Sequence, residues 1–263
     1  MPFDSDRAPA VWVDDLWMTF RVTREKNQTL KGTLARMRDR SKQSMVIEAL
    51  RGVSFQVPAG SVYGVIGRNG AGKSTLLRTI AGILPPTAGR VAVWGRVTPL
   101  LSLGVGFNRE LTGRENILLG GLTAGLTSAE VYANHDAVEE FAGLGDAIDF
   151  PMRTYSSGMF GRLAFAVAAH LKPEILLIDE ALAAGDASFK QKSMNKIVEL
   201  CTTQECTVLI VSHGLEVVKQ LADGCVWLDR GLVRAEGPAE EVVAAYMSDE
   251  HIEATSLTAL EDV

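Results

Sequence analysis

The sequence predicts an α/β fold built around a mainly parallel β-sheet, and three runs of residues carry this prediction. A strand-like stretch at 61–66 leads directly into a glycine-rich segment and then into an apolar helical pattern that ends at Gly82. Strand, glycine-rich loop and helix in that order begin a phosphate-binding α/β unit. Two continuous apolar runs, ILLID at 175–179 and TVLIVSH at 207–213, are typical of strands buried inside a parallel sheet.

The remaining elements are predicted from local periodicity and from turn residues. A first strand is expected at 11–20 and a second at 52–57. In chain order we then expect short strands near 90–95 and 98–103, helices over about 113–150, 157–170, 187–203 and 215–222, strands at 225–229 and 232–236, a last helix from Gly237 and an acidic tail at 248–263.

A basic insert, residues 21–48, separates the first two predicted strands. It is rich in Arg and Lys and lacks Pro, and Leu30, Leu34, Met37 and Met45 give it a patchy helical period. We interpret it as a basic amphipathic segment. A solvated surface helix and a segment that faces a partner or a membrane explain this pattern equally well.

Composition bounds the class of protein. The 263 residues suffice for one large domain with at most a small appendage. The net charge of -6 argues against a broadly basic nucleic-acid-binding surface, so we expect no nucleic-acid partner. Cys201, Cys206 and Cys225 form no C-x-x-C pair, which favours a reducing cytosolic compartment over a zinc site or a disulfide framework.

No targeting or membrane-spanning pattern is found. The N-terminus has no basic stretch followed by an apolar run, so we expect no signal peptide. The longest apolar run, 163–171, is far shorter than the roughly 20 residues that cross a bilayer. Any membrane role is therefore expected to depend on a partner.

The glycine-rich segment 67–74, GRNGAGKS, matches the motif G-x-x-x-x-G-K-[ST]. Its glycines let backbone N–H groups cradle the β- and γ-phosphates of a nucleotide, Lys73 neutralises them, and Ser74 offers a hydroxyl to Mg²⁺. The positive end of the following helix adds to anion binding. The predicted phosphate-loop residues are Gly67, Arg68, Asn69, Gly70, Ala71, Gly72, Lys73, Ser74 and Thr75.

A second part of the site is predicted where the apolar strand 175–179 ends in Asp179 and Glu180 follows. A strand that ends in Asp places a carboxylate at the edge of the sheet beside the phosphate loop. Asp179 would hold Mg²⁺ through water, and Glu180 would polarise the water that attacks the γ-phosphate. An acidic pair after an apolar strand is common, so this signal gains its weight from the phosphate loop.

Residues 155–159, YSSGM, lie at the start of a predicted helix, about twenty residues before Asp179. They resemble the ABC signature, which usually reads LSGGQ, and Ser156, Ser157 and Gly158 are the residues that this resemblance places on a γ-phosphate. Taken alone, the segment would be an ordinary helix N-cap. Its position between the two phosphate motifs favours the signature.

Two further positions agree with the ABC ATPase family. Asp186 ends the segment 183–186, which falls where ABC proteins carry a loop that crosses the dimer interface. His213 follows a buried strand and matches the switch histidine that senses the γ-phosphate. The resemblance implies that Glu180, His213 and Lys73 perform the catalysis. It also implies that Phe20, or failing that Trp17, stacks on adenine.

This family resemblance implies a P-loop NTPase of the ABC ATPase type over residues 1–247, with a central mixed or parallel sheet, an antiparallel β subdomain and a helical subdomain at about 113–170. In the family, the phosphate loop, Asp, Glu and His come from one chain and the signature from the other. The resemblance therefore implies a head-to-tail homodimer, or a dimer with a similar chain, that holds two ATP molecules with Mg²⁺.

Longer stretches resemble the ATP-binding subunits that export O-antigen, capsular polysaccharide and teichoic acid, and this resemblance covers about 10–247. It rests on GRNGAGKSTLLRTIAGIL, GRVTPLLSLGVGFNRELTGREN, YSSGMFGRLAFAVAAHLKPEILLIDEALAAGDASF and VSHGLEVVKQLADGCVWLDRG. It implies export of a lipid-linked polysaccharide, with a cell-wall galactan as one candidate, through an integral-membrane permease at the cytoplasmic face of the plasma membrane. In that family the segment 100–104 lies near the mouth of the membrane channel.

Departures from the family leave alternatives open. Most ABC proteins have a Gln before the segment LTGREN. No Gln occurs there, and Asn108 or Glu110 are the candidates to replace it. The chain ends soon after the ATPase core, so we expect no C-terminal sugar-binding domain. Alternatives are an ABC transporter ATPase for a lipid or a drug, a soluble ABC ATPase of translation or DNA repair, and a P-loop kinase or GTPase.

Overall fold

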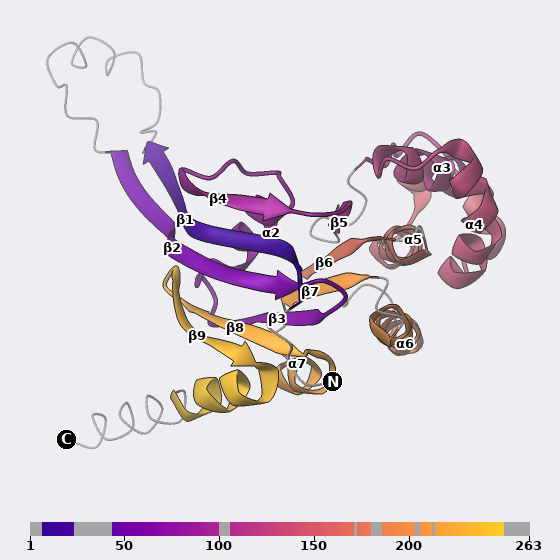
Figure 1. Cartoon of the computed structure of the whole chain (residues 1–263). Helices are drawn as coiled ribbons and strands as arrows, with labels where there is room; N and C mark the ends of the chain where they lie inside the picture. Colours follow the sequence, from indigo (N-terminus) through magenta and orange to yellow (C-terminus); the bar gives the residue numbers. More distant parts are fainter. Residues whose placement is uncertain are drawn as a thin grey trace, which may run out of the picture.

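The computed structural model describes residues 7–23, 44–99, 106–170, 173–179, 186–202, 206–211 and 214–249. They form a six-stranded sheet, a three-stranded antiparallel sheet and a group of helices set to one side of the sheets (Figure 1). This architecture confirms the predicted α/β fold with an antiparallel part and a helical part. Among the described residues, no helix is both long and apolar enough to cross a membrane.

The six-stranded sheet has the order β5-β6-β7-β3-β8-β9. Its strands are β3 (Val62–Ile66), β5 (Val97–Pro99), β6 (Ile175–Asp179), β7 (Thr207–Val211), β8 (Gly224–Asp229) and β9 (Leu232–Pro238). Neighbours pair in parallel except β8 and β9, which are antiparallel. Because both faces of the central strands are covered, β3 and β7 are buried along their whole length, as their unbroken apolar sequences predict.

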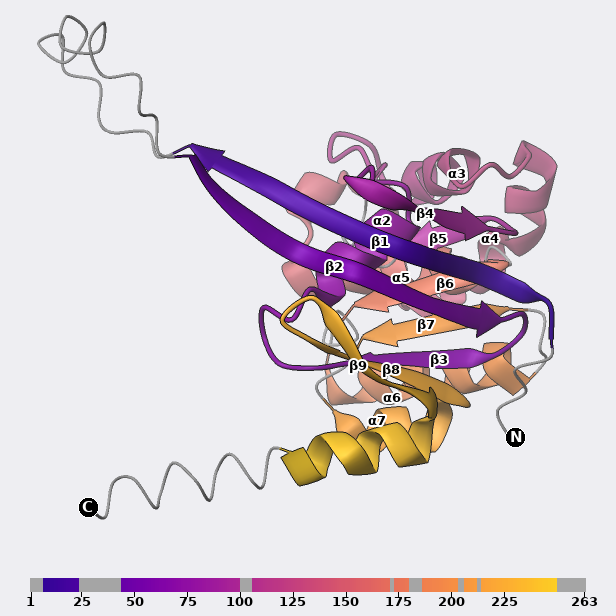
Figure 2. The same ribbon diagram turned by 60° about the vertical axis from the view of Figure 1, so that its left-hand side comes forward.

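The antiparallel sheet has the order β2-β1-β4, with β1 (Pro9–Thr23), β2 (Ser44–Pro58) and β4 (Ala88–Val93). Figure 2 shows β1 and β2 as one long ribbon that crosses in front of the six-stranded sheet. Helix α2 (Lys73–Ile80) joins the core between the two sheets, where Leu16, Leu50, Leu76 and Leu209 are all fully buried.

The ends of the predicted basic insert, 21–48, are strand rather than helix. Arg21 pairs with Val46, and Thr23 pairs with Ser44, at the far end of the β1–β2 ribbon. Met45, which we assigned to a helical stripe, is a strand residue with 66% of its surface exposed. Cross-strand pairing fixes these residues, and a helical period read along one segment cannot detect that. Leu30, Leu34 and Met37 lie outside the described residues.

The helical part contains α3 (Gly113–Thr123), α4 (Ser128–Ala142), α5 (Ser157–His170) and two short 3-10 helices, η1 (Gly145–Asp149) and η2 (Met152–Thr154). Capping boxes begin α3 at Thr112–Glu115 and α4 at Thr127–Glu130. Helices α6 (Ala187–Thr202), α7 (Leu215–Leu221) and a last helix over 239–249 complete the fold. This last helix includes the first two residues of the predicted tail, 248–263; the tail residues from 250 lie outside the described part.

We predict that Leu76→Ala lowers the free energy of unfolding by about 2–5 kcal/mol, because it leaves a cavity where α2 packs between the sheets. Leu122→Ala in α3 is the matched control, since 43% of Leu122 is exposed and its loss should change stability by about 0.5 kcal/mol or less. Urea denaturation of both variants measures the difference. Equal effects would contradict this account of the core.

Candidate functional site

The phosphate loop follows the carboxyl end of β3 and has a backbone that requires glycine. Gly67, Gly70 and Gly72 have φ angles of 141°, 80° and 106°. A Cβ on Gly67 would clash with the carbonyl oxygen of Leu228, and one on Gly72 would lie 2.6 Å from the carbonyl oxygen of Ala49. A Cβ on Gly70 would meet nothing within 4 Å, so that position faces open space and only its φ angle demands glycine.

The tight turn between β8 and β9 supports the loop from one side. Arg230 and Gly231 both have positive φ angles, 48° and 79°, as a two-residue hairpin turn requires. The Gly231 N–H donates to the carbonyl oxygen of Ala71 over 3.0 Å, and the Arg51 N–H donates to the carbonyl oxygen of Gly231 over 2.8 Å. Hydrogen bonds therefore join the loop to β2 through this turn.

Lys73 begins α2, and its ammonium group lies against the phosphate loop. Its Nζ donates to the carbonyl oxygens of Gly67 over 2.7 Å and of Arg68 over 3.0 Å, and the residue is 6% exposed. Arg68, Asn69, Gly70 and Ser74 are exposed beside it, whereas Ala71 is buried and Thr75 is half-buried. A buried cation beneath an exposed loop of backbone amides is suited to bind a phosphate chain.

Asp179 lies at the same edge of the sheet as the phosphate loop. It ends β6 and pairs with Val211 of β7, which pairs in turn with Val65 near the end of β3. The Asp179 carboxylate and the Ser74 hydroxyl carry oxygen atoms of the kind that Mg²⁺ prefers as ligands. Glu180 and His213 lie outside the described residues, one and two positions after Asp179 and Val211 in sequence.

The signature segment occupies an exposed helix N-terminus. The Met159 N–H donates to Ser156 Oγ over 3.2 Å, so Ser156 caps α5 as an ordinary N-cap residue would. Ser156 and Ser157 are exposed, and Gly158 is half-buried. Accepting the capping bond leaves the Ser156 hydroxyl proton available to a ligand.

Asp186 and Phe20 each have a defined local role. Asp186 is exposed, and its Oδ1 accepts a 2.8 Å bond from the Phe189 N–H, which caps α6. Phe20 pairs with Ile47 across the ribbon and is half-buried against the core. Ala49, two residues from Ile47, contacts the phosphate loop at Gly72, so Phe20 lies on the part of the ribbon that passes this loop. The alternative, Trp17, donates its indole N–H to Asp15 over 3.0 Å.

Asn116 is a key polar residue that sequence reasoning missed. It is fully buried in α3, and its Nδ2 donates to the carbonyl oxygens of Asn108, Leu111 and Thr112 at 2.9, 3.2 and 2.8 Å. Its Oδ1 accepts the Asn108 N–H over 2.8 Å. One side chain therefore fixes the loop 108–112. The only signal for it in the sequence is a lone amide at the start of an apolar helix.

Both candidates to replace the usual Gln belong to this same loop and have local partners. Asn108 Oδ1 accepts the Glu110 N–H over 3.0 Å. The Glu110 carboxylate pairs with Arg153 over 3.4 Å, and both side chains are largely exposed. These contacts hold the loop to the segment that precedes the signature. Neither contact identifies which of the two residues replaces the usual Gln.

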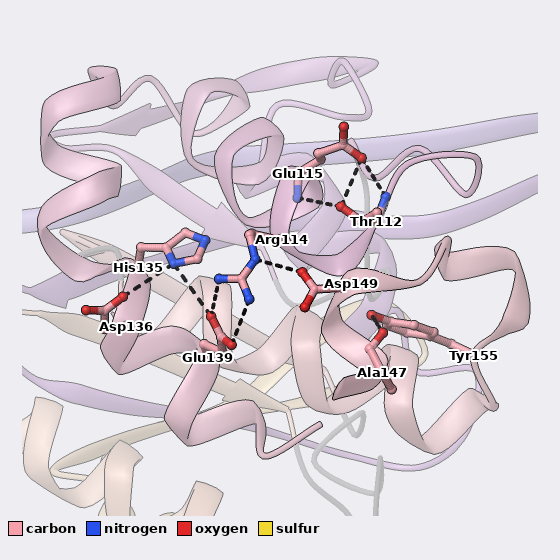
Figure 3. A network of polar contacts seen from close by, with 9 residues as sticks. All are labelled: Thr112, Arg114, Glu115, His135, Asp136, Glu139, Ala147, Asp149 and Tyr155. Carbon is pink, nitrogen blue, oxygen red and sulfur yellow. Dashed lines mark hydrogen bonds and ion pairs between the residues drawn. The ribbon is translucent and has the colours of Figure 1, made fainter. Parts of the chain in front are cut away.

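An ion-pair network organises the helical part (Figure 3). The Arg114 guanidinium binds Glu139 of α4 at 2.6 and 3.1 Å and Asp149 of η1 at 2.9 Å. The bond from Arg114 lowers the pKa of Asp149. His135 is buried with its Nδ1 3.8 Å from Glu139. Next to this network, the Tyr155 hydroxyl donates to the carbonyl oxygen of Ala147 over 2.8 Å, and burial raises the pKa of Tyr155.

The cysteine thiols in the described part of the chain lack the features of a reactive thiol. Cys206 and Cys225 are buried and unpaired. Burial raises the pKa of each thiol to about 12, so both stay protonated at neutral pH. Among the residues that the structure describes, no group of three or more His, Cys, Asp or Glu side chains forms a metal cluster.

Known proteins resemble this chain over most of its length. A family model described as "ABC transporter" matches residues 50–183. The O-antigen export system ATP-binding protein RfbB of Myxococcus xanthus is 45% identical over 242 residues, which is 90% of this chain and 55% of that relative. The teichoic acids export ATP-binding protein TagH of Shouchella clausii is 43% identical over 198 residues, 75% of this chain and 54% of that relative. The chain thus spans about half the length of these two relatives.

The fold also matches a solved structure. An ATP-binding cassette, MJ0796, in a dimeric post-hydrolysis state with ADP and phosphate bound, superposes with a TM-score of 0.68. The match covers 87% of this chain and 98% of that one at 20% sequence identity. At this identity, the likeness establishes the fold.

We predict that Asn116→Ala lowers the free energy of unfolding by about 1–3 kcal/mol, because it removes the side-chain donor to three loop carbonyl groups and leaves the Asn108 N–H without the acceptor that Asn116 Oδ1 supplies. Asn134→Ala is the matched control. Asn134 is exposed in α4, and its single bond to the carbonyl oxygen of Glu130 can be replaced by water. Chemical denaturation of both variants tests this, and an equally stable Asn116→Ala protein would contradict it.

Proposed function

This chain belongs to the ABC transporter family, and from that membership we propose that it is the ATP-binding and ATP-hydrolysing subunit of an exporter for a lipid-linked polysaccharide. One observation carries the ATPase part: a glycine-dependent phosphate loop with a buried Lys73 lies at the sheet edge where Asp179 ends β6. The cargo is supported by the relatives, which are named for O-antigen and teichoic acid export.

Binding of the nucleotide is assigned to the phosphate loop and to two oxygen ligands. The loop amides and the Lys73 ammonium would hold the phosphates, and the Lys73 carbonyl contacts would give way to phosphate oxygens. The Ser74 hydroxyl and the Asp179 carboxylate would hold Mg²⁺, which neutralises phosphate charge when bound. Phe20 is the proposed platform for adenine.

Hydrolysis is assigned to residues that follow β6 and β7. Glu180 would accept the proton of the water that attacks the γ-phosphate, and His213 would contact that phosphate. The register of Asp179 with Val211 supports this assignment, because each strand ends next to one of the two residues. Glu180 and His213 lie outside the described part of the chain.

Completion of the site is assigned to a second copy of the chain. Ser156 and Ser157 are exposed at the N-terminus of α5, where another protomer can reach them. We propose that ATP binding brings this end onto the phosphates of a partner chain, with Asp186 at the interface. The cycle of closing and opening would drive a membrane permease at the cytoplasmic face of the plasma membrane.

We predict that Glu180→Gln lowers ATP turnover at least about 100-fold, because it removes the general base, while ATP still binds and holds a dimer together. Phosphate release and size-exclusion chromatography with ATP and Mg²⁺ measure the two effects. Glu240→Gln, a surface carboxylate 3.8 Å from Lys219, is the control. Near-normal turnover in Glu180→Gln would rule out Glu180 as the base.

Lys73→Ala is expected to weaken nucleotide binding itself by about tenfold or more, since it deletes the buried cation of the phosphate loop. Titration with a fluorescent ATP analogue measures the Kd, and Lys219→Ala is the surface control. An unchanged Kd in Lys73→Ala would contradict the phosphate-loop assignment.

The partner and the cargo class require a separate experiment. The tagged protein is captured from detergent-solubilised membranes of its own host, and mass spectrometry identifies what co-purifies. We expect a multi-helix permease encoded beside glycan-assembly enzymes. A permease for a lipid or a drug, a ribosome or DNA would contradict polysaccharide export and leave the ATPase assignment intact.

A further inference from the structure

Tyr155 occupies the first position of the signature segment, directly before the exposed Ser156. Its hydroxyl donates to the carbonyl oxygen of Ala147 over 2.8 Å, and Figure 3 shows the ring turned toward that carbonyl. Leu, the residue usual at this position, has no donor for such a bond. Tyr155 therefore ties the start of the signature to η1 by a bond that the usual Leu cannot make.

The acceptor of this bond is held in place from two directions. Ala147 belongs to η1, whose last residue, Asp149, binds the Arg114 guanidinium over 2.9 Å. The same guanidinium binds Glu139 through two nitrogens, so η1 is joined to α4 as well as to α3. Because both helices are anchored in the buried core, the Ala147 carbonyl is a fixed reference point for Tyr155.

The space around the Tyr155 hydroxyl is also defined by a glycine. A Cβ on Gly113 would clash with Tyr155 Oη, and it would lie 2.8 Å from the Cδ1 of Ile148. Gly113 has no positive φ angle, so its backbone conformation does not require glycine. Glycine is needed at this position because any Cβ would occupy the space of the Tyr155 hydroxyl. On the backbone side, the Tyr155 N–H donates to the carbonyl oxygen of Met152 over 3.1 Å.

We propose that Tyr155 is a positioning residue that sets the N-terminus of α5 for contact with the nucleotide of a partner chain. The proposal rests on the function assigned above to Ser156 and Ser157. Tyr155 is the last side chain anchored to the helical part before these two exposed residues. Removing its hydroxyl frees the segment that must meet a phosphate, while the phosphate loop of the same chain keeps all its own contacts.

Tyr155→Phe tests this, because it deletes the hydroxyl and keeps the ring. We expect kcat for ATP hydrolysis to fall about fivefold to tenfold, the range for loss of one positioning hydrogen bond. The Kd of the isolated chain for nucleotide should stay the same. Tyr132→Phe is the matched control, since Tyr132 is 62% exposed on α4 and should leave every value unchanged. Gly113→Ala should reproduce the loss by displacing the hydroxyl.

A double-mutant cycle with Ser156→Ala separates positioning from general stability. If Tyr155 acts through the signature serine, Tyr155→Phe should change kcat less than twofold in the Ser156→Ala protein. Full turnover in Tyr155→Phe, or an undiminished loss in the Ser156→Ala background, would overturn the inference. Full turnover in Ser156→Ala alone would contradict the proposed function of the signature, and the inference with it.

Discussion

The close approach of three backbone segments at the phosphate loop is the constraint on which the structure depends. Gly67 lies against Leu228 of β8, and Gly72 lies against Ala49 of β2. The β8–β9 turn at Gly231 is hydrogen-bonded to the loop and to β2. No side chain fits at these two glycines, so the antiparallel ribbon, the parallel sheet and α2 can pack together only with this loop conformation. Phosphate binding and core packing thus share one piece of backbone.

Sequence reasoning succeeded where structure is encoded locally. The helix predicted at 157–170 and the strand predicted at 175–179 coincide with α5 and β6. It failed where distant segments decide the structure. The pairing of Arg21 with Val46 turned the ends of the basic insert into strand, and no helical period could reveal it. Asn116 escaped notice for a different reason: its partners lie only 4, 5 and 8 residues away, but they are carbonyl groups that become acceptors only once the loop 108–112 has folded.

The candidate site is divided between two parts of the chain that are built on different principles. The phosphate loop and Asp179 are held by sheet register and by glycine, which leave little freedom. The signature segment is an exposed helix N-terminus held by polar contacts, of which the Tyr155 bond to Ala147 is the last. Under the proposed function, a phosphate loop fixed by the sheet would meet a signature segment that the Tyr155 bond holds in position on a partner chain.

The central claim is that one chain supplies the phosphate loop and another supplies the signature. Mixing Lys73→Ala protein with Ser156→Ala protein tests it most directly, by measuring ATP hydrolysis before and after subunits exchange. In a mixed dimer, one of the two sites pairs an intact loop with an intact signature. Random exchange makes about half of the dimers mixed, so activity should rise toward about a quarter of the wild-type value. If each site were completed within a single chain, every site would carry one defect, and the mixture would stay at the reduced activity of its components.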